Sequence, residues 1–131
     1  MPYENYRKLK EEDVRALYHY FTEEVAPVRH QGPETSLPFP FNQRWGIRAW
    51  NWVALEPPGF RPHAEDPQIA RGAYLVEGPG HCGACHTPRN LLMAQDGTDA
   101  SSESFLRGGE VDGWTAPDLR GAKSPVALWS A

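Results

Sequence analysis

Cysteine is scarce in this sequence, which has only Cys82 and Cys85 among its 131 residues. Two cysteines so close together cannot staple distant loops, which excludes a disulfide framework. Long apolar runs are also missing, because no window approaches the roughly 20 apolar residues needed to cross a bilayer. The N-terminus, MPYENYRKLKEEDV, lacks the apolar core of an export signal. We therefore expect neither a transmembrane segment nor a signal peptide in this sequence.

An excess of basic residues is missing as well. Thirteen Lys and Arg residues against 17 Asp and Glu residues leave a formal net charge of -4. Nucleic acids and anionic membranes are held by clustered Lys and Arg that neutralise phosphates, so we expect no nucleic-acid partner. The length allows one ordinary domain, or one small domain with a substantial tail.

Proline and glycine, in contrast, are abundant. The chain contains 13 prolines and 12 glycines, while its hydrophobic fraction of 40% still permits a modest core. This balance predicts a mostly α fold with extensive irregular loops. Seven of the prolines fall within residues 26–63, which reads as a Pro-rich linker. Six Phe and Trp residues in the same stretch are too much aromatic surface to leave solvated, so we expect it to pack on a partner or on its own core.

Three segments have helical character. Residues 10–25 carry apolar side chains at helical spacing, which suits either a packing partner for a larger domain or a plain surface helix. A short helical turn is expected around Trp45 to Leu55, with Arg44 and Arg48 on its exposed side. A further helix begins at Asp66, because Asp is a good N-cap and Pro67 suits the first helical position. Gly78, Pro79 and Gly80 end this helix.

Directly after that stop stands the motif Cys82-Gly83-Ala84-Cys85-His86. Such a run lets two thiols add to the vinyl groups of one haem, while the adjacent histidine supplies an axial nitrogen to the iron. Two intervening residues place both sulfurs on one side of a single turn. We therefore predict covalent haem c attachment at Cys82 and Cys85, with His86 as the axial iron ligand.

Three competing interpretations of the motif remain. Structural zinc normally needs four ligands with a second paired knuckle, and this sequence has no such pair. A thiol redox motif would follow a strand, whereas a helix is expected here. Two buried thiols, or a local disulfide beside an incidental histidine, form the third interpretation.

The opposite axial ligand of the haem has few candidates in this sequence. Met93 and His81 lie too close to the motif to reach the other face of the macrocycle, and we expect Met93 to serve packing. The three remaining histidines are candidates that more often occur as surface residues; they are His19, His30 and His63.

Several longer strings carry a resemblance that covers almost the whole chain. With them the sequence resembles the multihaem cytochrome c subunit of bacterial membrane-bound alcohol, sorbitol and gluconate dehydrogenases. The strings are Met1-Pro2-Tyr3, residues 12–18 (EDVRALY), residues 37–42 (LPFPFN), residues 71–78 (RGAYLVEG), residues 80–90 (GHCGACHTPRN) and residues 113–119 (GWTAPDL).

The resemblance implies an internal piece of such a subunit. Residues 1–26 are similar to the closing helix of one cytochrome c domain, with Met1 at the position of that domain's axial methionine. Residues 27–65 match the Pro-rich and aromatic-rich interdomain linker. Residues 66–131 are similar to the N-terminal part of the next cytochrome c domain, which carries the haem motif but ends before its own axial methionine.

The family implies a periplasmic, membrane-associated subunit that passes electrons from a quinoprotein or flavoprotein dehydrogenase subunit to ubiquinone. The chain would then be an electron-transfer component rather than a catalyst by itself, and Arg89 is a candidate contact for a haem propionate. The alternative is an apoprotein remnant or protein-binding fragment that never receives haem. In this family attachment needs assembly machinery that works outside the cytoplasm, and the N-terminus shows no export signal. A zinc-binding module is the third option.

Overall fold

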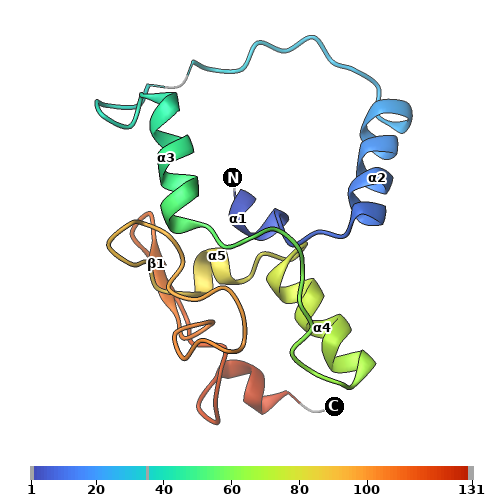
Figure 1. The fold of residues 1–131 in the computed structure, drawn as a ribbon, viewed down its shortest axis with the longest axis vertical. Coiled ribbons are helices and arrows are strands. Elements are labelled where there is room, and N and C mark those ends of the chain that lie inside the picture. The colour runs from blue at the N-terminus through green and yellow to red at the C-terminus, as the bar shows by residue number, and fades with distance from the viewer. Residues whose placement is uncertain (1, 35, 130–131) are drawn as a thin grey trace. The chain divides into compact units, whose positions relative to one another are not determined.

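The computed structural model describes residues 2–34 and 36–129 and is about 38% helical, with short strands and much loop. This confirms the expectation of a mostly α chain with extensive irregular segments. The helices are α1 (Tyr3–Tyr6), α2 (Glu11–His19), the π-helical turn η1 (Tyr20–Glu24), α3 (Arg44–Ala54), α4 (Pro67–Glu77), α5 (Gly83–His86) and the 3-10 turn η2 (Pro125–Leu128), and the strands are β1 (Gly109–Val111) and β2 (Trp114–Ala116) (Figure 1).

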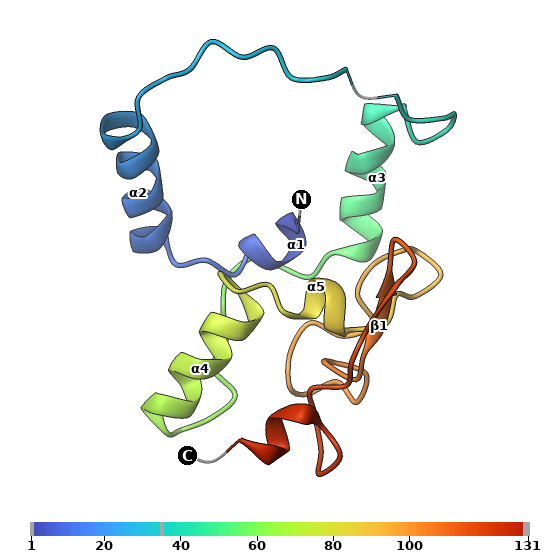
Figure 2. The same cartoon turned by 180° about the vertical axis from the view of Figure 1, so that it is seen from behind.

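The chain forms two compact units. One unit joins the first nine residues to everything from Pro57 onward, and the other holds Lys10–Glu56. In the first unit, α5 lies beside β1, which both Figure 1 and Figure 2 make visible. The haem motif and the N-terminal helix α1 therefore belong to the same unit, although about 80 residues separate them in the sequence.

Helix α4 begins and ends where the sequence predicts. The Asp66 carboxylate accepts hydrogen bonds from the backbone N–H groups of Gln68 (2.7 Å) and Ile69 (3.1 Å), and Pro67 occupies the first turn. These bonds satisfy donors that have no partner inside the helix. The inner face of α4 buries Tyr74, whose ring meets the edge of Phe60 at a centroid distance of 5.3 Å. The end of the Pro-rich stretch thus packs on α4.

The second unit differs in part from expectation. Helix α2 and η1 together match the helix expected over residues 10–25, but neither buries a residue, and Val14 and Leu17 remain about half exposed. Helix α3 is an eleven-residue helix rather than a short turn. No proline interrupts residues 41–56, and the helix ends at Ala54, just before the Glu56-Pro57 step that disfavours helical backbone.

A β-hairpin follows the haem motif and was not expected. Strands β1 and β2 pair antiparallel, with Val111 opposite Trp114. The two residues between them, Asp112 and Gly113, both have positive φ angles of 50° and 80°. A two-residue turn of this kind matches the twist of paired strands and favours Asp-Gly. The Asp-Gly pair was the available sequence signal.

Gly83 lets the turn of α5 pack directly on the core of the first unit. A Cβ atom at this position would lie 2.5 Å from Gln95 Oε1 and 2.8 Å from Phe105 Cε2. Both neighbours are buried, as are Thr87 and Ala94. A side chain at position 83 would therefore force Gln95 or Phe105 to move, whereas glycine lets α5 lie directly against this small core.

A buried ion pair joins the N-terminal segment to the end of α4. Lys8 Nζ lies 2.9 Å from Glu77 Oε2 and also donates to the backbone oxygen of Thr98. The side chains of Lys8 and Glu77 are only 13% and 2% exposed. Burial raises the pKa of the Glu77 carboxyl above its ordinary value, and the bond to Lys8 only partly offsets this. The pair therefore holds the segment at a desolvation cost.

The Lys8→Met substitution should destabilise the first unit by about 3 kcal/mol, because it leaves the Glu77 carboxylate buried without a cation. The Lys8→Met/Glu77→Leu double variant should recover most of the loss. Hydrogen exchange of the α4 amides would measure both effects. Lys10→Met is the matched control, since Lys10 pairs with Glu12 at the exposed surface, and we expect a change within about 0.5 kcal/mol there. A double variant as unstable as Lys8→Met would contradict this account.

The Gly83→Ala substitution should cost about 1–3 kcal/mol, because the new methyl group would overpack the contact with Gln95 and Phe105. The Gly72→Ala variant is the control, since a Cβ at this helical glycine meets nothing within 4 Å. It should be stabilising by about 1 kcal/mol, as alanine favours the helix. Thermal unfolding followed by circular dichroism tests the pair, and equal effects of both substitutions would argue against the packing role.

Candidate functional site

The haem motif forms a single helical turn on a loop that follows α4. The backbone N–H of Cys82 donates to the carbonyl of Val76 (3.1 Å), which ties the start of the turn to α4. The N–H of His86 donates to the carbonyl of Cys82 at 3.0 Å. Residues three apart on such a turn share a face, which gives Cys82 and Cys85 a common side. The prediction of a turn directly after a helix is confirmed.

Both cysteines are free thiols. Cys82 is half-buried and Cys85 is exposed. The local disulfide that the sequence left open is not formed, and the two sulfurs are not enclosed in a core. The thiols are thus accessible for a reaction with a bound group.

The ring of His86 is oriented by the loop that follows β2. Its Nδ1 lies 2.8 Å from the backbone oxygen of Pro117. A carbonyl oxygen can only accept a hydrogen bond, so Nδ1 is the donor in this contact and Nε2 is the ring nitrogen left for another partner. Histidines that bind metals are commonly held in this way through the other ring nitrogen. The sequence did not predict a role for Pro117, which lies 31 residues from His86.

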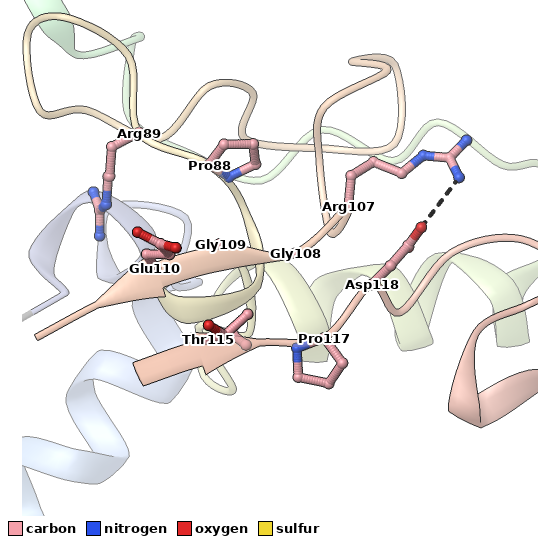
Figure 3. Close-up of a pocket in the computed structure, with 10 residues that line it drawn as sticks. Pro88, Arg89, Arg107, Gly108, Gly109, Glu110, Thr115, Pro117 and Asp118 are labelled. Atoms are coloured by element: carbon pink, nitrogen blue, oxygen red, sulfur yellow. Dashed lines mark ion pairs between the residues drawn. The ribbon is translucent and has the colours of Figure 1, made fainter. Parts of the chain in front are cut away.

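The hairpin closes against the backbone of the motif (Figure 3). The N–H of Gly108 donates to the carbonyl of His86 at 2.8 Å. A Cβ at Gly109 would lie 2.7 Å from the carbonyl oxygen of Cys85, so two backbones approach each other here. An open pocket of about 600 Å³ lies beside this contact, with Arg107 and Asp118 paired at 3.5 Å on its edge.

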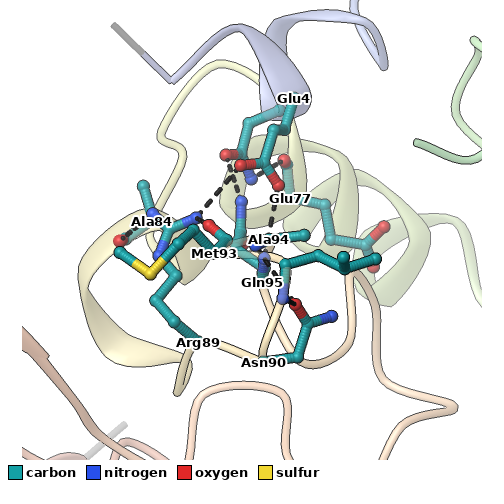
Figure 4. Close-up of polar contacts among 10 residues, drawn as sticks. Glu4, Glu77, Ala84, Arg89, Asn90, Met93, Ala94 and Gln95 are labelled. Atoms are coloured by element: carbon teal, nitrogen blue, oxygen red, sulfur yellow. Dashed lines mark hydrogen bonds and ion pairs between the residues drawn. The ribbon is translucent and has the colours of Figure 1, made fainter. Parts of the chain in front are cut away.

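Arg89 lies just after the motif and is held from three sides (Figure 4). Its Nη1 is 3.0 Å from the Glu4 carboxylate and 3.3 Å from the carbonyl of Met93, while Nη2 donates to the carbonyl of Ala84 at 2.9 Å. Sequence reasoning missed Glu4, because nothing local links residues 85 positions apart. The proposed propionate contact of Arg89 stays a prediction.

The structure brings Cys82, Cys85, His86 and Arg89 together, while Met1 lies outside the described residues. Two candidates for the opposite axial ligand form polar pairs: His63 lies 3.2 Å from Asp99, and His19 lies 3.2 Å from Glu23. Met93 is 70% exposed, contrary to the expectation that it serves packing.

Within residues 2–34 and 36–129, His, Cys, Asp and Glu side chains do not gather in groups of three or more that could hold a metal ion. The zinc interpretation therefore has no ligand cluster among these residues. In the same part of the chain, no helix is both long and apolar enough to cross a bilayer.

No protein-family model matches the sequence, but individual proteins do. The gluconate 2-dehydrogenase cytochrome c subunit of Pantoea cypripedii is 45% identical over 99% of the chain and 31% of its own length. The cytochrome c subunit of the quinone-dependent alcohol dehydrogenase of Gluconacetobacter polyoxogenes is 44% identical over 92% of the chain and 26% of its own length. The fructose dehydrogenase cytochrome subunit of Gluconobacter japonicus is 40% identical over 99% and 26%.

The chain spans less than a third of the length of these three relatives. The matches, at 40–45% identity, nevertheless cover 92–99% of it. The chain is homologous to a segment of the cytochrome c subunits of gluconate, alcohol and fructose dehydrogenases.

Proposed function

We propose that this chain carries electrons through one haem c that is attached to Cys82 and Cys85 and ligated by His86. The observation that carries the proposal is the hydrogen bond between His86 Nδ1 and the Pro117 carbonyl. It commits Nδ1 to the backbone and leaves Nε2 as the nitrogen available to an iron, on the same turn that presents two free thiols. The residues present thus fit a haem c in both number and chemistry.

Each residue of the turn has a distinct task in this proposal. The thiols of Cys82 and Cys85 would add across two vinyl groups, with sulfur bonding to one vinyl carbon and the thiol hydrogen passing to the other. His86 would hold the iron through Nε2, while the Pro117 carbonyl orients the ring through Nδ1. When bound, the haem supplies a one-electron couple. Arg89 is proposed to contact a propionate in addition to its present partners.

The wider setting follows from the relatives, whose names describe dehydrogenase cytochrome subunits. We propose that residues 1–26 close a preceding cytochrome c domain, with Met1 as an axial ligand of its haem, and that the start of this segment also contacts the next domain through Glu4, Asn5 and Lys8. Residues 27–65 would form the linker, and residues 66–131 would begin the next domain. The partners would be a quinoprotein or flavoprotein dehydrogenase subunit and ubiquinone, at the periplasmic side of a membrane.

A second candidate function is that of a protein-binding fragment without haem. The aromatic side chains of the second unit favour it, because Trp45 and Trp52 of α3 are 71% and 87% exposed. Exposed aromatic surface of this kind is typical of interaction sites. Haem attachment separates the two candidates directly.

The chain should gain the mass of one haem when it is directed to the periplasm together with c-type haem assembly factors. Intact mass spectrometry and a pyridine haemochrome spectrum would measure this. The Cys82→Ala/Cys85→Ala variant should lose covalent haem altogether, and each single variant should retain one thioether bond. An unmodified mass of the exported, unsubstituted chain would overturn the electron-transfer proposal in favour of the protein-binding one.

The axial role of His86 can be separated from attachment. The His86→Gln variant should change the iron spectrum of whatever haem is attached, because it removes the Nε2 ligand. The control is His81→Gln, since His81 is the neighbouring histidine outside the motif and its ring meets Tyr6. Identical iron spectra for the unsubstituted chain and His86→Gln would rule out the assigned ligand.

A further inference from the structure

Three side chains of the N-terminal segment reach into the unit that carries the haem motif. They are Glu4, Asn5 and Lys8, which we call the N-terminal clamp. Lys8 binds the end of α4, whereas Glu4 reaches Arg89 (Figure 4). Asn5 reaches Gln95, which lies against Gly83 of the motif.

The arm through Glu4 ends inside the motif. Its carboxylate pairs with Arg89 Nη1 at 3.0 Å, and Nη2 of the same guanidinium donates to the carbonyl of Ala84, between the two cysteines. The backbone N–H of Gln95 lies 3.4 Å from the other carboxylate oxygen. The side chains of Glu4 and Arg89 are 13% and 28% exposed, so their charges are partly withdrawn from water.

The arm through Asn5 reaches the buried Gln95. Its amide nitrogen donates to the carbonyl of Glu77 (3.0 Å), and its amide oxygen accepts from Gln95 Nε2 (2.7 Å), both in buried surroundings. Gln95 in turn lies against Gly83, and its Oε1 is buried without a hydrogen-bond partner among the described residues. The orientation of the Gln95 amide therefore depends on Asn5.

We propose that Glu4 and Asn5 are positioning residues for the haem, and that Glu4 also sets its reduction potential by neutralising Arg89. This inference rests on the proposed haem attachment and deepens it. Asn5 positions the turn through Gln95, which packs against Gly83. Glu4 positions it through Arg89, which donates to the Ala84 carbonyl and lies three residues after His86.

The electrostatic part has a definite sign. An oxidised haem carries one more positive charge than a reduced one, so a nearby uncompensated cation disfavours oxidation. Glu4→Gln removes the negative partner and leaves the charge of Arg89, which should raise the midpoint potential. Arg89→Gln leaves the charge of Glu4 and should lower it. The double variant carries neither charge, so its potential should return toward that of the unsubstituted chain.

Redox titration of the haem-loaded full chain at low ionic strength tests this. The variants are Glu4→Gln, Arg89→Gln and the double substitution, with far-UV circular dichroism and haem content as checks of folding. A purely structural role would shift both single variants in the same direction through greater exposure of the haem, without cancellation in the double variant. Opposite shifts that cancel support the clamp.

The matched control is the pair formed by Glu11 and Arg15. It has the same chemistry, with Arg15 Nη2 2.6 Å from Glu11 Oε1, but lies in the other unit with both side chains 78% exposed. Glu11→Gln and Arg15→Gln should leave the potential unchanged, because exposed charges are screened. Glu4→Asp keeps the charge and should keep most of the original potential.

The outcomes distinguish a failure of this inference from a failure of the proposed haem attachment. Equal potentials for the unsubstituted chain, Glu4→Gln and Arg89→Gln would overturn the clamp while leaving haem attachment intact. If Glu4→Gln fails to fold, Arg89→Gln is compared with Arg89→Lys, which keeps the positive charge. A fall in potential for Arg89→Gln that Arg89→Lys does not show supports the clamp, and equal shifts for the two variants overturn it. An unsubstituted chain without haem would overturn the proposed function, and this inference with it.

Discussion

The close approach of Gly83 to the small core is the constraint on which the haem motif depends. Because Gly83 has no side chain, α5 can rest on Gln95 and Phe105. Two further contacts then hold the turn α5. Gly109 brings the hairpin against the carbonyl of Cys85, and the Pro117 carbonyl contacts the His86 ring. The missing side chain of Gly83 thus allows the backbone of the motif and the His86 imidazole to be held by backbone groups, which are less mobile than side chains.

Two ion pairs join the N-terminal segment to the unit that carries the motif. The N-terminal segment brings Lys8 to the buried Glu77 and brings Glu4 to Arg89, so neither Glu77 nor Arg89 is left without an opposite charge. Burying a charge costs desolvation free energy. Each pair matters chiefly because loss of one partner would leave the other charge buried and uncompensated, which is more destabilising than the intact pair. This N-terminal segment therefore supplies the opposite charges for a unit whose other residues begin only at Pro57.

Local sequence signals predicted the local structure well. Asp66 and Pro67 marked the start of α4, and Gly78 marked its end, because capping and backbone preference act over only a few residues. The helix near residues 44–54 was expected to be shorter, since prolines on both sides drew more weight than the uninterrupted stretch between them. The hairpin was not predicted. Asp112-Gly113 is typical of a hairpin turn, but strands of three residues are too short to show the alternating pattern that predicts a strand.

The sequence by itself determined the chemistry of the motif: two thiols and one imidazole within five residues, a combination that spacing alone makes readable. Tertiary structure decided how these groups are held and charged. Pro117 lies 31 residues from His86, and Glu4 lies 85 residues from Arg89. Such partners leave no local pattern, because a hydrogen bond between distant segments requires only one suitable group at each end, and folding decides which of many such groups meet.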